Sequence, residues 1–172
     1  MNKIDLNIEL IDSKWEHIGG NLYEYSAEIL QAVIDEIKTL DNFEFLQKEK
    51  PVTINLCLSN DEDIRSLNKE FRDMDNATNV LSFANIDDEN FSRDMDIFEE
   101  IELGDIVISY ETLQKEAGMK NIPFINHYSH LLIHGILHLF GFDHIEDDEA
   151  DYMEDIETKV LKNLNIDNPY TE

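Results

Sequence analysis

Three of the six histidines in this chain lie in one short stretch, HGILHLFGFDH at residues 134–144, whose other positions are mostly apolar. His134 and His138 are four residues apart, so on a helix both rings project from the same face. Gly141 lets the chain leave that helix in a conformation that other residues rarely adopt, and His144 can then return to the same point. Three neutral imidazoles with one open position are the ligand set of a catalytic zinc site. The spacing therefore predicts one zinc ion per chain, bound by His134, His138 and His144.

Three neighbouring side chains leave alternatives open. His127 and His130 share a helical face with His134, and His130 could replace one of the three ligands. Otherwise these two histidines line the approach to the site or hydrogen-bond to a neighbour. Asp143 either orients a ligand from outside the coordination sphere or caps the turn. The expected ligand set stays His134, His138 and His144, because the break at Gly141 is needed only if His144 takes part.

The residue after the first histidine limits the chemistry. In metzincin proteases, whose histidine spacing is the same, that residue is the glutamate that acts as general base. Here it is Gly135. In addition, nothing in the sequence indicates a strand edge that would bind a peptide. A peptidase is therefore not favoured, and a glutamate introduced at Gly135 is not expected to create one.

The segments that must position these residues alternate irregularly between strands and helices. Period-two alternation or β-branched runs predict strands at 3–10, 52–59, 78–84 and 103–110. Apolar residues at helical spacing predict a helix at 22–40, and a run that is apolar nearly all round predicts one at 124–141. Cap-type residues with acids in the first turn predict a helix at 59–72, an acidic start with a basic end predicts one at 146–164, and a short helix is expected to stop near Gly118. The acidic stretch 85–102 is predicted to be a solvated loop. About four strands and five helices indicate an α+β fold with a small mixed sheet, the zinc site lying on a central buried helix.

The composition bounds the class of protein. A chain of 172 residues, 42% of them hydrophobic, is expected to form a single domain over residues 1–172. The longest apolar run is too short to cross a bilayer, and the N-terminus lacks the apolar core of a signal peptide, so a cytoplasmic protein is expected. The formal net charge is −26, from 39 acidic and 13 basic side chains. Such a surface repels polyanions at long range, which by itself argues against a nucleic-acid partner.

Several motifs together resemble those of the YbeY family of bacterial endoribonucleases and ribosomal-RNA maturation factors. The stretch HGILHLFGFDH is similar to that family's signature, as are SLNKEFRDMDNATNVLSF (residues 66–83) and LGDIVIS (residues 103–109). The closing DNPY also resembles a common family ending. The likeness runs from about residue 51 to the C-terminus. One departure is Ala84, where the family usually has proline after the TNVLSF-type motif.

The resemblance implies an α+β fold around a four-stranded sheet and zinc held by His134, His138 and His144. It also implies cleavage of single-stranded RNA, in 3′-end maturation of the small-subunit ribosomal RNA and in ribosome quality control. The family's functional arginine falls on Arg72. Ribosomal RNA and the ribosome, or a ribosomal protein, are the implied partners, with no role for a membrane.

Elementary chemistry is compatible with this activity. Phosphodiester cleavage builds charge on non-bridging oxygens, which a zinc ion and a bidentate guanidinium can share. The nucleophile is either a metal-activated water or the RNA's own 2′-OH. Arg72 is otherwise a cation at a helix C-terminus that pairs with Asp73 or Asp75. A local basic stripe of Arg65, Lys69 and Arg72, extended by Lys115 and Lys120, could guide the RNA strand.

Two other functions compete with an endoribonuclease. One is a zinc hydrolase of another class, against which Gly135 argues. The other is a non-catalytic ribosome-assembly factor in which zinc only stabilises the fold. Metal analysis followed by an RNA cleavage assay on the same sample separates the three.

Overall fold

A four-stranded mixed sheet forms the centre of the molecule, which a computed structural model describes over residues 4–18, 20–143 and 145–170. Its strands stand in the order β1-β2-β4-β3. β1, β2 and β4 are parallel to one another, whereas β3 pairs antiparallel with β4 and lies at the edge. The bounds are Ile4–Leu10 for β1, Val52–Ser59 for β2, Val80–Ala84 for β3 and Ile101–Ser109 for β4. The predicted α+β fold with about four strands is confirmed.

Five long helices occupy positions where the sequence predicted helices: α1 (Leu22–Ile37), α3 (Asp61–Arg72), α5 (Tyr110–Lys120), α6 (Phe124–Leu139) and α7 (Asp147–Asn163). Two short helices, α2 (Glu44–Gln47) and α4 (Phe91–Ile97), and two 3-10 turns, Ser13–His17 and Asn85–Asp87, complete the described elements. Side-chain caps set two of the helix starts, because Asn21 accepts from the Glu24 amide and Asn60 from the Asp63 amide.

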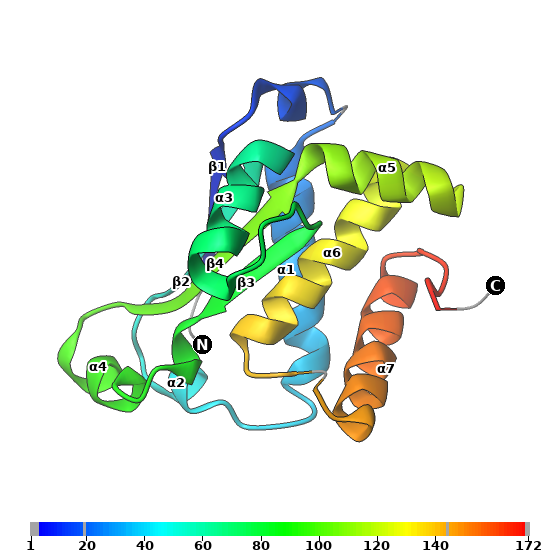
Figure 1. Ribbon diagram of the computed structural model, residues 1–172. Helices are drawn as coiled ribbons and strands as arrows, with labels where there is room; N and C mark the ends of the chain where they lie inside the picture. Colours follow the sequence, from blue (N-terminus) through cyan, green and yellow to red (C-terminus); the bar gives the residue numbers. More distant parts are fainter. Residues whose placement is uncertain (1–3, 19, 144, 171–172) are drawn as a thin grey trace.

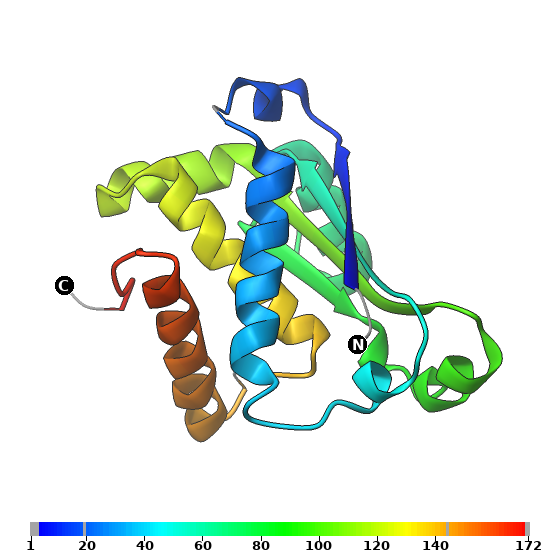
Figure 2. The same ribbon diagram turned by 180° about the vertical axis from the view of Figure 1, so that it is seen from behind.

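The helices cover the two faces of the sheet unequally. α1 and α6 lie against one face, and α7 packs on these two helices as an outer layer (Figures 1 and 2). On the other face α3 covers one end, where Ile64 packs with Leu81 and Val107. The rest of that face is polar, with Asn55 bonded to both Asn7 and Asp105. The helical face therefore holds the main core and places α6 at the centre of the molecule.

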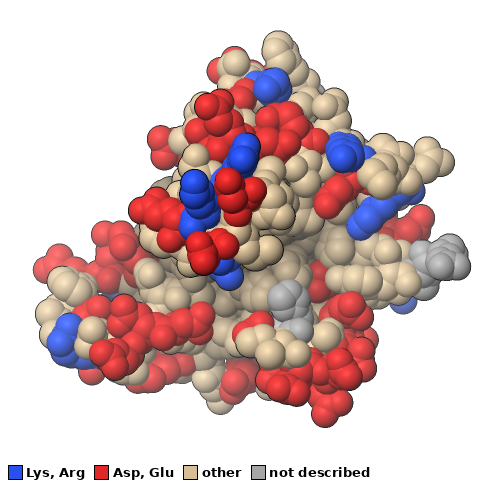
Figure 3. All heavy atoms as spheres, in the orientation of Figure 1, with Lys and Arg blue, Asp and Glu red and all other residues tan. Residues whose placement is uncertain are grey.

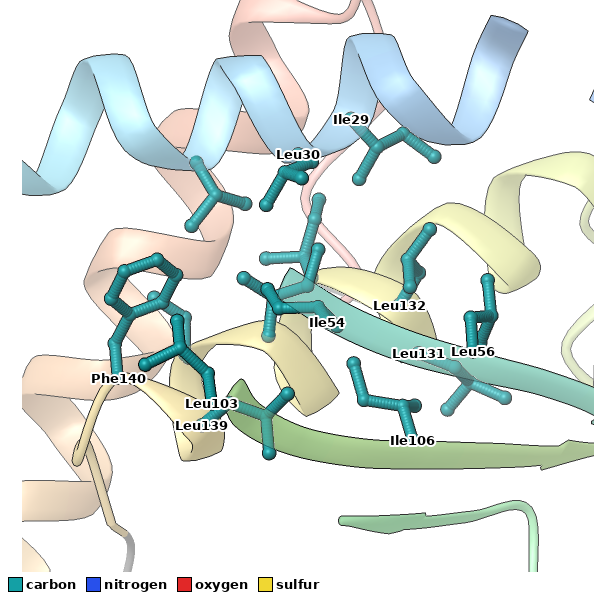
Figure 4. Close-up of a cluster of buried hydrophobic side chains, with 14 of the residues drawn as sticks. Ile29, Leu30, Ile54, Leu56, Leu103, Ile106, Leu131, Leu132, Leu139 and Phe140 are labelled. Atoms are coloured by element: carbon teal, nitrogen blue, oxygen red, sulfur yellow. The ribbon is translucent and has the colours of Figure 1, made fainter. Parts of the chain in front are cut away.

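The main core joins three layers of apolar side chains (Figure 4). Ile29 and Leu30 come from α1, Ile54 and Ile106 from the sheet, and Leu132 from α6, and each is at most 3% exposed. Each buried aliphatic side chain of this size stabilises the fold by about 1.5–3 kcal/mol relative to exposure. α6 is consequently anchored in the core along its length, which fixes the place of the histidines that it carries.

Two local predictions were wrong. The stretch 85–102 is not a loop throughout, because it contains a 3-10 turn and α4, where Phe91 and Met95 are buried and anchor the acidic segment to the core. α5 does not stop near Gly118 but continues to Lys120, and Asn121 then takes the left-handed conformation that ends it. The buried Phe91 and Met95 explain the first difference, and the cap at Asn121 in place of one at Gly118 explains the second.

No strand edge that would bind a peptide was indicated by the sequence, and the structure adds the position of one edge strand. β3 is an edge strand, and its residues Val80–Ser82 line the main cleft described below. Two of its backbone groups are already bonded within the chain, however. The Val80 amide donates to the Asn79 side chain, and the Ser82 carbonyl accepts from Arg72.

Among the described elements, no helix is long and apolar enough to cross a membrane.

Candidate active site

Helix α6 lies so close to the sheet that a side chain at one position would press on its neighbours. A Cβ atom at Gly135 would come within 2.9 Å of the Ile106 side chain and 3.3 Å of the Ser82 hydroxyl oxygen. The Ser82 hydroxyl also donates to the Gly135 carbonyl. The position after the first histidine therefore faces the sheet and not the cleft. This packing explains why the residue that serves metzincins as a base is a glycine here.

The end of α6 turns the chain back toward the histidines. Gly141 has a φ of 99°, in the left-handed region, and the Phe142 amide donates to the Leu137 carbonyl while the Gly141 amide donates to that of His138. This pair of bonds is the Schellman termination of a helix. The predicted role of Gly141 as the residue that ends the helix is confirmed. Beyond it, Phe142, Asp143 and Ile145 all line the same cleft as His134 and His138.

His134 and His138 form the chemical centre of that cleft. Their Nε2 atoms lie 3.0 Å apart, and the rings meet edge to face with centroids 4.6 Å apart. Both side chains are partly exposed. His144, the third predicted ligand, lies outside the described residues. Within those residues no group of three or more His, Cys, Asp or Glu side chains is arranged to hold a metal ion.

Sequence reasoning missed a buried carboxylate behind these rings. Glu157 of α7 is 1% exposed and accepts hydrogen bonds from His130 Nε2 at 2.6 Å, the Tyr170 hydroxyl at 2.9 Å and His134 Nδ1 at 3.4 Å. Burial raises its pKa, but the bonds from His130 and His134 outweigh burial and leave the pKa at about 2. A signal was present in the sequence, because Glu157 interrupts the apolar stripe of α7 between Met153 and Leu161.

His127 has a different environment at the start of α6. Its side chain is 2% exposed, and Nε2 lies 2.8 Å from the Glu116 carboxylate, which also accepts from Asn79. Burial lowers the pKa of His127, against the opposing influence of Glu116. Both roles left open for this residue are observed, because the ring hydrogen-bonds to a neighbour and also lines the cleft.

Arg72, the last residue of α3, borders the same cleft. Its Nη2 donates to the Ser82 carbonyl at 2.9 Å, and the guanidinium lies 5.7 Å from the centre of the Phe83 ring. Arg72 makes no ion pair with a carboxylate in the described part of the chain. Asp75, one of its two suggested partners, pairs instead with Arg65 at 2.8 Å. The Arg72 guanidinium is thus exposed and keeps donors available for an anion.

The cleft itself has a volume of about 660 Å³ and runs between edge strand β3 and helix α6. It is lined by four histidines of α6 and by Arg72 and Lys120, against two acidic residues, Asp87 and Asp143. Arg65, Lys69 and Lys115 do not line it, so the expected basic stripe contributes two of its five members. Acidic side chains gather over α4 and α7, whereas over α3 and the end of α5 basic side chains stand among acidic ones (Figure 3).

The donor set at the centre of the cleft fits a zinc ion. Two imidazole nitrogens bound tetrahedrally to one zinc at about 2.0–2.1 Å lie about 3.3 Å apart, close to the 3.0 Å observed between the Nε2 atoms. A carboxylate that accepts from the other ring nitrogen, as Glu157 does from His134, is the usual partner of a zinc-bound histidine.

Comparison with known proteins gives the class and then the family. The family model described as Endoribonuclease YbeY matches residues 18–165. Endoribonuclease YbeY of Sinorhizobium fredii is 38% identical over 172 residues, covering 99% of this chain and 94% of the relative. Endoribonuclease YbeY of Agrobacterium fabrum is also 38% identical, over 170 residues, covering 99% and 96% of the two chains.

A solved structure shows the same fold. The solution structure of a Thermotoga maritima protein, 22% identical, matches 96% of this chain and 92% of its own length with a TM-score of 0.52. The fold and the relatives together define a hydrolase that cleaves RNA internally. The chain belongs to the YbeY family of endoribonucleases. The likeness extends through the first fifty residues, further than the motifs indicated, because strand β1 and helix α1 carry no motif of their own.

Proposed function

We propose that this protein is a zinc-dependent, single-strand-specific endoribonuclease of the cytoplasm that acts in 3′-end maturation of small-subunit ribosomal RNA and in ribosome quality control. The observation that carries the proposal is the pair of Nε2 atoms of His134 and His138, 3.0 Å apart in a cleft that Arg72 also borders. The motifs that resemble the family supply the biological role. We propose residues 1–172 as one functional domain.

His134, His138 and His144 would hold the ion. The residues that flank His144 support its inclusion, since Asp143 and Ile145 line the cleft that contains the other two histidines. When bound, zinc would polarise a phosphoryl oxygen and lower the pKa of a water molecule. His130 is less suited as a ligand, because its Nε2 already meets Glu157 and Tyr170.

The chain's own residues supply binding and charge. Arg72 offers a planar fork of donors, which matches the non-bridging oxygens of a phosphodiester where negative charge builds up during cleavage. Lys120, at the other side of the cleft, is placed to hold a neighbouring phosphate as a point charge. Together they border the groove that a strand must follow to reach His134 and His138. The Gly135 position contributes no base, because its packing against Ile106 excludes a side chain.

The net charge of −26 favours a targeted enzyme over a general nuclease. Duplex nucleic acid carries about one negative charge per 1.7 Å and binds proteins chiefly through many phosphate contacts. A cleft with Arg72 and Lys120 provides few such contacts, and the acidic surface around it repels the rest of the strand. We therefore propose that the ribosome or a ribosomal protein delivers the RNA.

The test combines metal analysis with cleavage on one sample. Protein purified without chelator should contain one equivalent of zinc and should cut a single-stranded RNA that spans the 3′ end of precursor small-subunit ribosomal RNA, leaving the same sequence intact as a duplex. Removal of the metal should abolish cleavage, and added zinc should restore it. Zinc-loaded protein that leaves both RNAs intact would point instead to an assembly factor whose metal is structural.

A further inference from the structure

A negative charge is buried in α7, where it contributes nothing to the apolar packing of that helix. Glu157 belongs to the buried face of that helix with Met153, Ile156, Val160 and Leu161. A carboxylate at such a position loses its hydration, and an apolar residue of similar size would pack without that cost. Among the described residues its partners are two histidines and a tyrosine, with no lysine or arginine.

The two carboxylate oxygens of Glu157 serve different partners. Oε1 accepts from His130 Nε2 at 2.6 Å and from the Tyr170 hydroxyl at 2.9 Å. Oε2 faces His134 Nδ1 at 3.4 Å. An ionised carboxylate only accepts hydrogen bonds, so the proton of neutral His134 is held on Nδ1 and the lone pair is left on Nε2. That Nε2 atom is the one that faces His138.

The C-terminal segment completes this arrangement. Tyr170 lies in the segment that follows α7 and places its ring edge to face on His130 of α6, with centroids 5.4 Å apart. Burial and the charge of Glu157 raise the pKa of Tyr170, so its hydroxyl remains a donor at neutral pH. The hydroxyl also lies 3.0 Å from His130 Nε2. His130 and Tyr170 thus hold Oε1 from two sides and fix the direction in which Oε2 points.

We propose that Glu157 is a positioning residue for His134, and that Tyr170 and His130 are the groups that hold Glu157 in place. The inference rests on the proposed zinc site, since it assigns Glu157 the task of presenting the Nε2 lone pair of His134 to the ion. It extends the site to the last helix and the C-terminal segment, neither of which contributes a proposed ligand.

Glu157→Gln tests the proposal with little change in shape. The amide keeps one acceptor oxygen and replaces the other with an NH2 donor, so it cannot accept hydrogen bonds at both of the positions that Oε1 and Oε2 occupy. Zinc affinity, measured by competition with a chelator, should fall about 10–100-fold, the scale for loss of a partner that orients a metal-bound histidine. Asp151→Asn is the matched control, because it removes one charge from an exposed position of the same helix and should leave affinity unchanged.

A second readout needs no metal. Long-range proton–nitrogen NMR of the histidine rings in metal-free protein should show His134 protonated on Nδ1 in the wild type and a mixture of both forms in Glu157→Gln. Tyr170→Phe keeps the ring and removes the hydroxyl, so it should weaken zinc binding by a smaller factor than Glu157→Gln does. Melting temperatures of all variants check that each protein is folded.

The outcomes separate this inference from the proposed function. Wild-type affinity and an unchanged His134 tautomer in folded Glu157→Gln would overturn it, as would wild-type His134 protonated on Nε2. If Glu157→Gln does not fold, the wild-type tautomer and Tyr170→Phe still decide, and unchanged zinc affinity in Tyr170→Phe would remove the C-terminal segment from the site. A wild-type protein that binds no zinc would refute the proposed function, while the NMR result would still test the role of Glu157.

Discussion

The two halves of α6 present histidines on the same face of one helix to opposite kinds of surroundings. In the first half, His127 is 2% exposed and its Nε2 lies against the Glu116 carboxylate. In the second half, His134 is 23% exposed, with Nδ1 toward a carboxylate and Nε2 toward His138. The residue type is the same and the spacing is helical in both. In His127 the carboxylate occupies Nε2, whereas in His134 it occupies Nδ1 and Nε2 faces the neighbouring histidine. This difference distinguishes a structural histidine from a candidate metal ligand.

Replacing histidines one at a time should give the largest contrast between the halves. We expect His134→Ala and His138→Ala to lose most of the zinc and to reduce RNA cleavage roughly 10³-fold or more, the scale for removing an essential group from an active site. His127→Ala should keep one equivalent of zinc. Metal analysis and initial cleavage rates on folded protein measure both effects.

His144→Ala extends this comparison to the third proposed ligand, which should behave like His134. If His144→Ala retains a full equivalent of zinc while His130→Ala loses it, the ligand assignment is wrong. If only His127→Ala loses zinc, the ligand lies in the first half of α6 and not in the second half.

Replacing Arg72 tests whether RNA is cleaved beside the half of α6 that is proposed to bind the metal. Arg72→Ala should lower cleavage roughly 10²-fold, because one preorganised charge is removed from the reacting phosphate. Zinc content should not change, and stability should fall by about 1 kcal/mol or less with the loss of one exposed hydrogen bond to Ser82. Arg72→Lys should recover little, since an ammonium lacks the bidentate fork.

The control for Arg72 is Arg65→Ala on the same helix, whose guanidinium pairs with Asp75 and does not line the cleft. It should retain most of the activity. Near-wild-type cleavage by folded, zinc-loaded Arg72→Ala would exclude the arginine from the mechanism and return it to the role of a helix-end cation.

Replacing Gly135 tests whether close contact with the sheet holds the second half of α6 in its position. Gly135→Ala should lower the free energy of unfolding by about 1–3 kcal/mol, because its Cβ would press on Ile106. Gly118→Ala in α5 is the matched control. A Cβ there meets no atom within 4 Å, so this change should be neutral or stabilise by up to about 1 kcal/mol.

Urea unfolding measures both glycine variants. Equal stabilities would show that α6 can move away from the sheet at little cost. Gly135→Glu should be more destabilised than Gly135→Ala and should not hydrolyse peptides, since the new side chain would point at the sheet. Clear hydrolysis of a casein-type substrate by a folded Gly135→Glu protein would contradict this account of the site.

The smallest expected effect concerns the first half of α6 and pH. The pKa of His127 is lowered by burial, so below a pH of about 6.5 the unfolded chain takes up a proton that the folded chain does not. The stability that the neutral His127 contributes is therefore present above that pH and is lost as pH falls toward the folded pKa. His127 faces Glu116 and Lys120 of α5 and His130 of α6.

His127→Gln should flatten this dependence. Between pH 7.5 and pH 5.5 the free energy of unfolding of the wild type should fall by up to about 1 kcal/mol more than that of the variant. Urea titrations at the two pH values measure the difference, and His17→Gln, which removes an exposed histidine, is the control. Parallel pH profiles for wild type and His127→Gln would show that burial has no net influence on this ring.

Local patterns were sufficient for much of the fold. Alternation predicted β1 and helical spacing predicted α1. Cap residues and end charges predicted α3 and α7, and a run that is apolar nearly all round predicted α6, because each of these signals lies within the segment itself. The acidic segment 85–102 was misjudged, since two buried side chains, Phe91 and Met95, outweigh many exposed charges. The edge position of β3 was also missed, because strand order depends on pairings far apart in the sequence.

The sequence by itself determined the spacing of His134 and His138, the glycine that ends their helix and the motifs of an RNA-cleaving family, all of which depend on residues close together in the chain. Only the tertiary structure decided which histidine nitrogens face the cleft. Glu116, Glu157 and Tyr170 reach the rings of α6 from α5, α7 and the C-terminal segment. Their contacts exist only once these elements have packed, because hydrogen-bond partners of a buried ring come from whichever element the core brings beside it.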